Sequence, residues 1–348
     1  MLRLSALGDI THTLPVLRTL QKNWPVTPIT WIIGKTEYEL VKGIEGVEFI
    51  IFDKSQGFAA YPALRRQMQG RHFDVLLHLQ VSLRASAISF LVPATIKLGF
   101  DRERAKDLQW LFTNRKIIPA STRQHVVDSF MEFTAYFDLK PVLEWDLPVL
   151  ESARESLRHK LDKAWLSHAK GENRLLVINP CAVAKSRNWR DWNIDGYAAV
   201  ADYASTRLGM KVILSGGASM REQNVAAAIF SLCSEKPLNL VGQTSIAELA
   251  ALLDMASVVI APDTGPAHIA NALNTPVIGL YAATNPQRAG PYRFQKLVVN
   301  HYEQALQKYY NLSVGDAPWG QRIQNAECMA LIKPEEVFSR LSKLFEPL

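Results

Sequence analysis

Residues 257–292 read SVVIAPDTGPAHIANALNTPVIGLYAATNPQRAGPY. They open with an apolar, β-branched run at 258–260, which predicts a strand buried on both faces of a parallel sheet. Residues 263–266 follow, where glycine permits a sharp bend and proline suits a first helical turn. Apolar residues then recur at helical spacing, and a second strand is expected over 276–281. The stretch therefore predicts a βαβ unit and indicates an α/β fold.

The turn of this unit is a candidate anion-binding site. Ligands of open α/β sheets bind beyond the carboxyl ends of the strands, where backbone N–H groups of helix N-termini face the crevice. Asp263, Thr264, Gly265 and His268 stand at that place. A purely structural interpretation is equally good on spacing alone, because Asp263 or Thr264 could simply cap the helix.

Strand-like and helical segments alternate along both halves of the chain. At 348 residues the chain exceeds the size of a single hydrophobic core, so two domains are expected. A polar segment around 157–174 separates the halves. We predict one doubly wound domain over residues 1–160 and a second over 161–332, with a final helix in 333–348.

The composition is that of an ordinary globular protein. Apolar residues make up 48% and charged residues 21% of the chain. No apolar run is long enough to span a membrane and no signal-peptide pattern is present, so a cytoplasmic location is expected. The three cysteines lie far apart, which predicts buried small hydrophobes rather than a disulfide framework or a zinc site.

The basic charge points to an anionic partner. The net charge is +6 and the pI is near 9.1. Nucleic acid, an anionic membrane surface and phosphorylated substrates are the candidates. No RNA-stacking or helix-turn-helix motif accompanies the charge, so nucleic acid is the weakest of the three.

The first strand-to-helix turn holds a candidate general base. Asp9 follows Gly8 at the carboxyl end of a short strand, where a carboxylate would face a cleft. On position alone, an Asp that caps the first helix is the better interpretation. Further along, Gln80 follows another strand, and the cations Arg102, Arg104 and Lys106 suit an acceptor that bears carboxylate or phosphate groups.

The second half carries a basic segment at 179–192, NPCAVAKSRNWRDW. Lys185 and Arg187 lie beyond a strand's carboxyl end and could neutralise a diphosphate leaving group. The two tryptophans of the segment, Trp189 and Trp192, are expected to pack in the core.

Three motifs stand in order along almost the whole chain: LSALGDITHTLP at 4–15, KSRNW at 185–189 and DTGPAH at 263–268. Together they resemble the heptosyltransferases of glycosyltransferase family 9. Within that family, GDITHTLP at 8–15 and KLGFDRERAKDLQWLFTNRK at 97–116 look closer to heptosyltransferase I than to the enzymes that add later heptoses. The resemblance implies a GT-B fold of two Rossmann-like domains facing across a cleft. The N-terminal domain would bind the acceptor and the C-terminal one the nucleotide-sugar donor, with the last helix packing back toward the N-terminal domain.

The resemblance also implies roles for the candidate residues. Asp9 would deprotonate the acceptor hydroxyl, and Arg187, helped by Lys185, would stabilise the departing diphosphate. Glu222 would bind the ribose, and the adenine contacts would fall at Gly242 and Thr244. The remaining donor contacts would be Asp263, Thr264, Gly265 and His268, and the acceptor contacts His12, Gln80, Arg102, Arg104 and Lys106.

The activity implied is inverting transfer of heptose from ADP-heptose to the Kdo of a Kdo-lipid A acceptor, with or without a phosphate on the Kdo. We expect no cofactor and no required metal, since no DxD-type pair lies near the donor site, and we expect peripheral contact with the inner membrane surface. The alternatives are a later-core heptosyltransferase, another GT-B nucleotide-sugar transferase and a non-catalytic nucleotide-binding protein. A nucleic-acid binder remains the last alternative; its affinity would depend strongly on salt.

Overall fold

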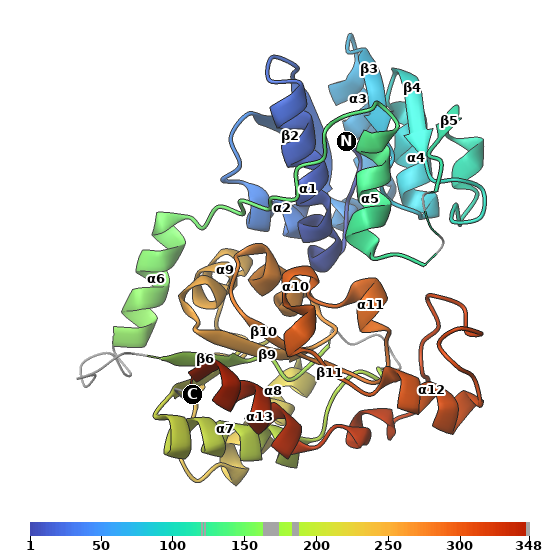
Figure 1. The fold of residues 1–348 in the computed structure, drawn as a ribbon. Helices are drawn as coiled ribbons and strands as arrows, with labels where there is room; N and C mark the ends of the chain where they lie inside the picture. The colour runs from blue at the N-terminus through green and yellow to red at the C-terminus, as the bar shows by residue number, and fades with distance from the viewer. Residues whose placement is uncertain (120, 122, 163–173, 183–187, 346–348) are drawn as a thin grey trace. The chain divides into compact units, whose positions relative to one another are not determined.

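The structure is a computed structural model that describes residues 1–119, 121, 123–162, 174–182 and 188–345. Its internal contacts divide the chain into two units, Met1–Pro148 and Val149–Leu348 (Figure 1). The division falls before the expected residue 160 because helix α6 (Glu151–Asp162) packs on α9 (Ile246–Met255) of the C-terminal unit. Arg154 pairs there with Asp254 at 2.6 Å.

The N-terminal unit is built on parallel strands. They are β1 (Ile29–Gly34), β2 (Val47–Phe52), β3 (Phe73–Leu77), β4 (Ala94–Gly99) and β5 (Arg115–Lys116). Strand β1 pairs with β2, and β4 lies between β3 and β5. Residues 1–4 join the two groups, because Leu2 forms parallel bridges to Ile32 on one side and His78 on the other. This central segment places the reversal of strand order between residues 1–4 and β3, where open α/β sheets bind ligands.

Helices cover this sheet. They are α1 (Leu7–Asn23), α2 (Lys35–Val41), α3 (Ala60–Met68), α4 (Leu83–Leu91) and α5 (Val126–Ala135), with short 3-10 turns at η1 (Lys54–Ala59) and η2 (Gln109–Leu111). Helix α1 packs on α2 and α5, and α3 packs on α4. One core joins Leu2 and Leu4 to Ile32, Leu64 and Ile88, all of them buried. The unit therefore has its own hydrophobic core.

The C-terminal unit contains one six-stranded parallel sheet in the order β11-β10-β9-β6-β7-β8. The strands are β6 (Leu175–Ile178), β7 (Lys211–Leu214), β8 (Leu238–Asn239), β9 (Val258–Pro262), β10 (Val277–Tyr281) and β11 (Val299–Asn300). Strands β7 and β8 follow β6 on one side, and β9, β10 and β11 follow it on the other, so the strand order reverses between β6 and β9. The strand, turn, helix and strand predicted over 257–292 are confirmed there as β9, α10 (Gly265–Ala272) and β10.

Helices lie on both faces of this sheet. Figure 1 shows α9 and α10 on one face, and α7 (Ile194–Leu208), α8 (Met220–Leu232) and α13 (Pro334–Phe345) on the other. The short elements α11 (Pro286–Ala289), η4 (Tyr292–Leu297), α12 (Tyr302–Tyr310) and η5 (Cys328–Leu331) complete the unit. The apolar stripe of α13, with Val337 and Leu341 fully buried, packs on α7 of the same unit. That this helix also packs toward the N-terminal domain stays a prediction.

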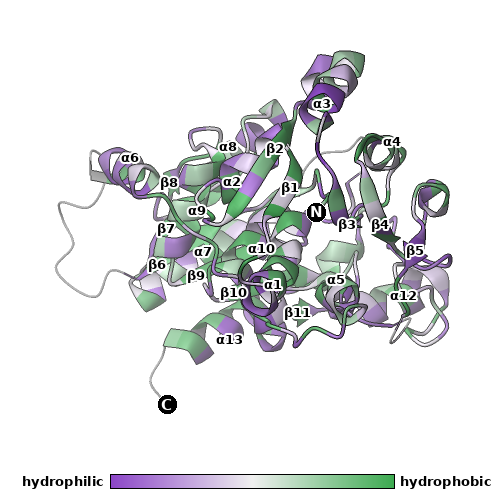
Figure 2. Cartoon of the chain, turned by 90° about the horizontal axis from the view of Figure 1, so that it is seen from above, coloured by the Kyte–Doolittle hydropathy of each residue, from purple (hydrophilic) through white to green (hydrophobic). Residues whose placement is uncertain are grey.

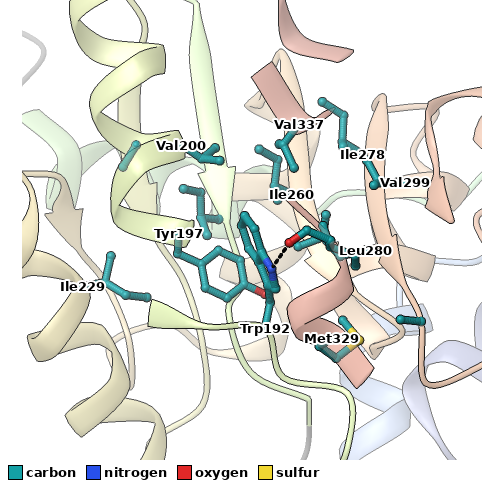
Figure 3. Packing of buried hydrophobic residues seen from close by; sticks show 14 of the residues in the cluster. Trp192, Tyr197, Val200, Ile229, Ile260, Ile278, Leu280, Val299, Met329 and Val337 are labelled. Carbon is teal, nitrogen blue, oxygen red and sulfur yellow. Dashed lines mark hydrogen bonds between the residues drawn. The ribbon is translucent and has the colours of Figure 1, made fainter. Parts of the chain in front are cut away.

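The core of the C-terminal unit centres on two aromatic side chains. Trp192 and Tyr197 meet edge to face with ring centroids 5.1 Å apart, and the Trp192 indole N–H donates to the Ile332 carbonyl at 3.2 Å (Figure 3). The core role predicted for Trp192 is confirmed, and so is the burial of the three cysteines. Among the described residues, no helix is long and apolar enough to cross a membrane.

Candidate active site

Asp263 directly follows strand β9, at the point where the strand order of the C-terminal sheet reverses. Its side chain is 13% exposed, with Nε2 of His268 3.3 Å from Oδ1. Nη1 of Arg190 donates to the Asp263 carbonyl at 2.7 Å and lies 3.7 Å from the carboxylate. Burial by itself would raise the pKa of Asp263, but the hydrogen bond from His268 and the charges of His268 and Arg190 bring that pKa below its usual value. Asp263 is therefore an ionised, fixed acceptor at the sheet edge.

The N-terminus of α10 follows directly, and no side chain in the described part of the chain is recorded as capping it. Thr264 occupies the N-cap position, but its hydroxyl does not bond to the helix. The Thr264 Oγ1 atom is buried and has no hydrogen-bond partner among the described residues. The capping interpretation of Asp263 and Thr264 is therefore not supported. The open first turn, with Gly265 as its first residue, offers backbone N–H groups to an anion.

The neighbouring strand ends complete the reversal point. Asn179 lies just after β6 and is only 2% exposed. Its hydrogen bonds connect the end of β6 with the ends of β9 and β7. Its N–H donates to the Ile260 carbonyl at 2.9 Å, and its Nδ2 donates to the Ser215 carbonyl at 3.0 Å. The predicted basic residues of this segment, Lys185 and Arg187, lie outside the described residues.

The residues predicted to bind the nucleoside lie at the ends of β7 and β8 in the same sheet. Both carboxylate oxygens of Glu222 accept hydrogen bonds, from the Gly217 N–H at 2.8 Å and the Ser219 hydroxyl at 2.6 Å. The Gly242 N–H donates to the Gly216 carbonyl at 3.0 Å. Gly242 has a φ of 76°, and a Cβ there would lie 3.2 Å from Cα of Ala218. Glycine is thus required for this close approach of the β7 and β8 ends.

Thr244 lies two residues beyond Gly242 and is half-buried. Ser245 caps α9 and accepts from the Glu248 N–H, so Thr244 is not needed as a helix cap. The structure therefore brings Glu222, Gly242 and Thr244 to the β7 and β8 side of the sheet, and Asp263 to the β6 and β9 side.

In the N-terminal unit, Asp9 lies in the first turn of α1 and is held by a buried arginine. The Arg3 guanidinium contacts the Asp9 carboxylate at 2.5 Å, with the Arg3 side chain 10% and the Asp9 side chain 38% exposed. Arg3 also donates to the Leu79 carbonyl at 2.6 Å and lies over the Phe130 ring at 5.2 Å. Asp9 Oδ2 also accepts the Ala6 N–H at 3.3 Å, so Asp9 both caps the helix and keeps one side open to solvent.

A cavity of about 290 Å³ opens at the carboxyl edge of this sheet. Gln80 is central to it, since its Oε1 accepts the N–H groups of Leu4 at 2.7 Å and Ser5 at 3.3 Å. The cavity lining also contains Lys54 and Arg84. Two cations and several hydroxyl and amide groups suit an anionic sugar. The full lining is Leu4, Ser5, Gly34, Phe52, Lys54, Gln80, Ser82 and Arg84.

The three predicted acceptor cations differ in their surroundings. Arg104 forms ion pairs with Asp101 and with Glu132, the latter at 2.6 Å, and its side chain is 23% exposed. Arg102 and Lys106 are exposed. Arg104 therefore braces its loop, while Arg102 and Lys106 remain accessible to a ligand.

His12 is buried in α1 rather than presented at the surface. It is 3% exposed, and its ring meets His125 edge to face at 5.7 Å. Among the described residues, no group of three or more His, Cys, Asp or Glu side chains is arranged to hold a metal ion.

Sequence reasoning missed Arg3, Lys54 and a small cavity of about 20 Å³ beside Asp263. Arg288 and Arg322 line that small cavity, together with Thr284. Arg3 stands in the strand directly before the GD turn, which is the one signal that could have identified it.

Comparison with known proteins places these sites in context. The sequence pattern of glycosyltransferase family 9 (heptosyltransferase) matches residues 61–314. The chain is 36% identical over 345 residues to the lipopolysaccharide core heptosyltransferase OpsX of Haemophilus influenzae, which covers 99% of this chain and 96% of that protein.

Two solved structures share the fold. A family 9 glycosyl transferase from Veillonella parvula matches with a TM-score of 0.82 at 20% identity, over 99% of this chain and 96% of that one. The Escherichia coli heptosyltransferase WaaC with ADP matches with a TM-score of 0.69 at 19% identity, over 99% and 98%. The predicted GT-B class, with its two Rossmann-like domains, is confirmed by these likenesses. The chain therefore belongs to glycosyltransferase family 9, the heptosyltransferase family, and is a glycosyltransferase.

Proposed function

We propose that this glycosyltransferase transfers heptose from ADP-heptose to the Kdo of a lipid A-linked acceptor, with inversion at the anomeric carbon. The observation that carries the proposal is the pair of reversal points. At the reversal point of the N-terminal unit lies an accessible carboxylate, that of Asp9. At the reversal point of the C-terminal unit, Asp263 is followed by the N-terminus of α10, where Thr264 makes no side-chain cap. The similarity to OpsX, a lipopolysaccharide core heptosyltransferase, supports the sugar and the acceptor class.

The donor would bind along the carboxyl edge of the C-terminal sheet. The diphosphate would accept hydrogen bonds from backbone N–H groups of the first turn of α10 and from the Thr264 hydroxyl, which has no partner among the described residues. The ribose would bond to Glu222, and the adenine would lie by Gly242 and Thr244. A structure of the related WaaC contains ADP, which supports an ADP-sugar as the donor. Asp263 and His268 would then orient the heptose hydroxyls.

The acceptor would bind in the cavity around Gln80. Lys54 and Arg84 would neutralise the Kdo carboxylate, and Ser5 and Ser82 would bond to its hydroxyls. A phosphate on the Kdo would add one more anion, and the exposed Arg102 and Lys106 would bind it.

The transfer itself needs a base and stabilisation of the leaving group. Asp9 would take the proton of the acceptor hydroxyl while its oxygen forms a bond to the anomeric carbon. The bond from that carbon to the diphosphate oxygen breaks, and the electron pair leaves on ADP. Arg187, with Lys185, and the helix N-terminus would stabilise the charge that develops there. No cofactor takes part in this scheme, and we propose that no metal is required.

The test is a transfer reaction with ADP-heptose and Kdo-bearing lipid A in EDTA, with the product's anomeric configuration determined by NMR. Formation of an inverted heptosyl-Kdo product supports the proposal. Transfer only to an acceptor that already carries heptose would instead identify a later-core enzyme. Transfer from another nucleotide sugar would replace the donor assignment, and ADP binding without transfer to any acceptor would favour the binding-protein alternative.

A further inference from the structure

The loop between β4 and β5 presents three large apolar side chains to solvent. Leu108, Trp110 and Leu111 are 51%, 46% and 57% exposed. They lie in and beside the 3-10 turn η2, and we name residues 107–111 the apolar turn. Single exposed apolar residues are ordinary, but three within four positions form a patch that marks an interaction surface.

The apolar turn is fixed in position by one buried side chain. Gln109 is fully buried; its Nε2 donates to the His78 carbonyl at 2.8 Å, and its Oε1 accepts the Phe100 N–H at 3.1 Å. Asp107 and Leu108 have φ values of 51° and 59°, in the left-handed region that non-glycine residues rarely adopt. The hydrogen bonds of Gln109 hold this strained turn in one conformation, so the exposure of Leu108, Trp110 and Leu111 is a fixed feature of the fold.

Positive charges flank the apolar turn on both sides in the sequence. Arg115 and Lys116 form the edge strand β5, which is drawn hydrophilic in Figure 2, and both are exposed. Arg102 places its guanidinium 5.5 Å from the Trp110 ring centroid. Lys106 is exposed as well, and the exposed acids of the loop are Glu103 and Asp107. With the two cations of β5 included, exposed cations outnumber exposed acids by four to two.

We propose that the apolar turn inserts into the surface of an anionic phospholipid bilayer. Trp110 would lie at the level of the headgroups, as tryptophan prefers, with Leu108 and Leu111 reaching the acyl chains. Arg115 and Lys116 would contact lipid phosphates, and this charge complementarity favours an anionic membrane over an apolar protein partner. Because Gln109 ties the turn to the strand end that precedes Gln80, docking would bring the acceptor cavity to the lipid surface; this last consequence rests on the proposed function.

The first test is co-sedimentation of the full-length protein with vesicles that contain phosphatidylglycerol, or phosphatidylcholine alone. We expect binding to the anionic vesicles and much weaker binding to the neutral ones. The double variant Trp110→Ser/Leu111→Ser should weaken binding by about tenfold or more, because it removes the inserted apolar area. The variant Arg115→Gln/Lys116→Gln should weaken it by about fivefold for each cation removed.

Two control variants change exposed residues elsewhere in the same unit. Val26→Ser alters a residue that is 93% exposed in the connection from α1 to β1, at the amino edge of the sheet. Arg65→Gln/Arg66→Gln removes two adjacent exposed arginines in the last turn of α3. Both should bind anionic vesicles as the unaltered protein does. The inference is overturned if the unaltered protein does not sediment with anionic vesicles, or if the Trp110/Leu111 variant binds them equally well.

A second measurement separates this inference from the proposed function. The Trp110→Ser/Leu111→Ser variant should retain turnover on a deacylated, water-soluble Kdo acceptor and lose it on the vesicle-embedded acceptor. Equal loss on both acceptors would contradict a membrane role for the turn. Absence of transfer by the unaltered protein would refute the proposed function, and the vesicle binding would still decide the inference.

Discussion

Asp9 owes its position to Arg3, whose buried guanidinium joins the helix carboxylate to the Leu79 carbonyl, two residues beyond β3. An arginine can make both contacts at once because its donors form a rigid planar fork. The carboxylate is therefore oriented by the strand that precedes it and not only by its own helix.

We predict that Arg3→Gln lowers kcat by about 10- to 100-fold with little change in the KM values, because misplacement of a catalytic group slows the chemical step. Arg3→Lys, which keeps the charge, should recover part of the loss. Lys22→Gln, which breaks the exposed pair with Glu144, is the control and should leave kcat unchanged. A folded Arg3→Gln protein with normal kcat would show that Arg3 does not orient Asp9.

The Thr264 hydroxyl offers a second test at this scale. Because it has no partner among the described residues, Thr264→Val should leave the free energy of unfolding nearly unchanged. ADP affinity should fall by about fivefold to tenfold, the value of one hydrogen bond. The matched control is Thr275→Val, which removes a buried bond to the Leu253 carbonyl at 2.8 Å. It should cost about 1 kcal/mol of stability and leave ADP affinity intact; the reverse pattern would refute a ligand role for Thr264.

Some site residues follow from the sequence and others do not. The position of Asp263 between a strand and a helix was predictable, since it follows an apolar run and precedes a helical segment. Asp9 was expected in the turn before the first helix, but α1 already begins at Leu7, so Asp9 lies in its first turn. The ion pairs of Arg104 were not, because Glu132 approaches it only once α5 has packed. Arg3 looked like one more strand residue, and its role appears only when β3 and α1 are in place.

At the scale of the elements, His78 makes the end of β3 sensitive to acid. Burial lowers the pKa of His78 to about 4, with the charge of Lys97 acting in the same direction and a hydrogen bond with the Gln80 backbone opposing. A folded-state pKa below the unfolded value of about 6.5 means that, as pH falls below 6.5, only the unfolded chain takes up the proton. Stability is therefore lost between about pH 6.5 and 4.

We predict that His78→Gln removes this part of the acid sensitivity. Between pH 7 and pH 5 the free energy of unfolding should fall by about 2 kcal/mol more in the unaltered protein than in the variant. Urea unfolding at both pH values measures the difference. The exposed His72, changed to Gln, serves as the control. An equal pH dependence in the His78 variant and the unaltered protein would be inconsistent with a buried neutral His78.

Most elements could be located from the sequence because their hydrophobic periods are clear. The two strands and the helix predicted over 257–292 are present as β9, α10 and β10, and the final helix α13 lies within the expected 333–348. Helix α6 was assigned in part to a polar linker, because it is polar on most of its surface. Among the residues of α6 whose side chains the structure describes, only Ala153, Leu157 and Leu161 are buried. They are spaced four residues apart, and that narrow stripe suffices to pack on α9.

For the whole molecule, the division at Pro148 predicts that donor binding resides in one unit. The C-terminal unit has a separate core and a complete six-stranded sheet. An expressed fragment of residues 149–348 should therefore fold and bind ADP within about threefold of the full chain's affinity, as expected of an independent domain. It should catalyse no transfer, because it lacks Asp9. A fragment that folds but does not bind ADP would contradict the assignment of the donor to this unit.

The most direct test of the account is to measure turnover and ADP affinity together for Asp9→Asn in the presence of EDTA. Asparagine keeps the size of the side chain and can still accept the Ala6 N–H, so the turn should persist. We predict that transfer falls by about 100- to 10,000-fold, the usual contribution of a general base, while ADP affinity is unchanged. Turnover near that of the unaltered protein would contradict the central claim that Asp9 removes the acceptor proton.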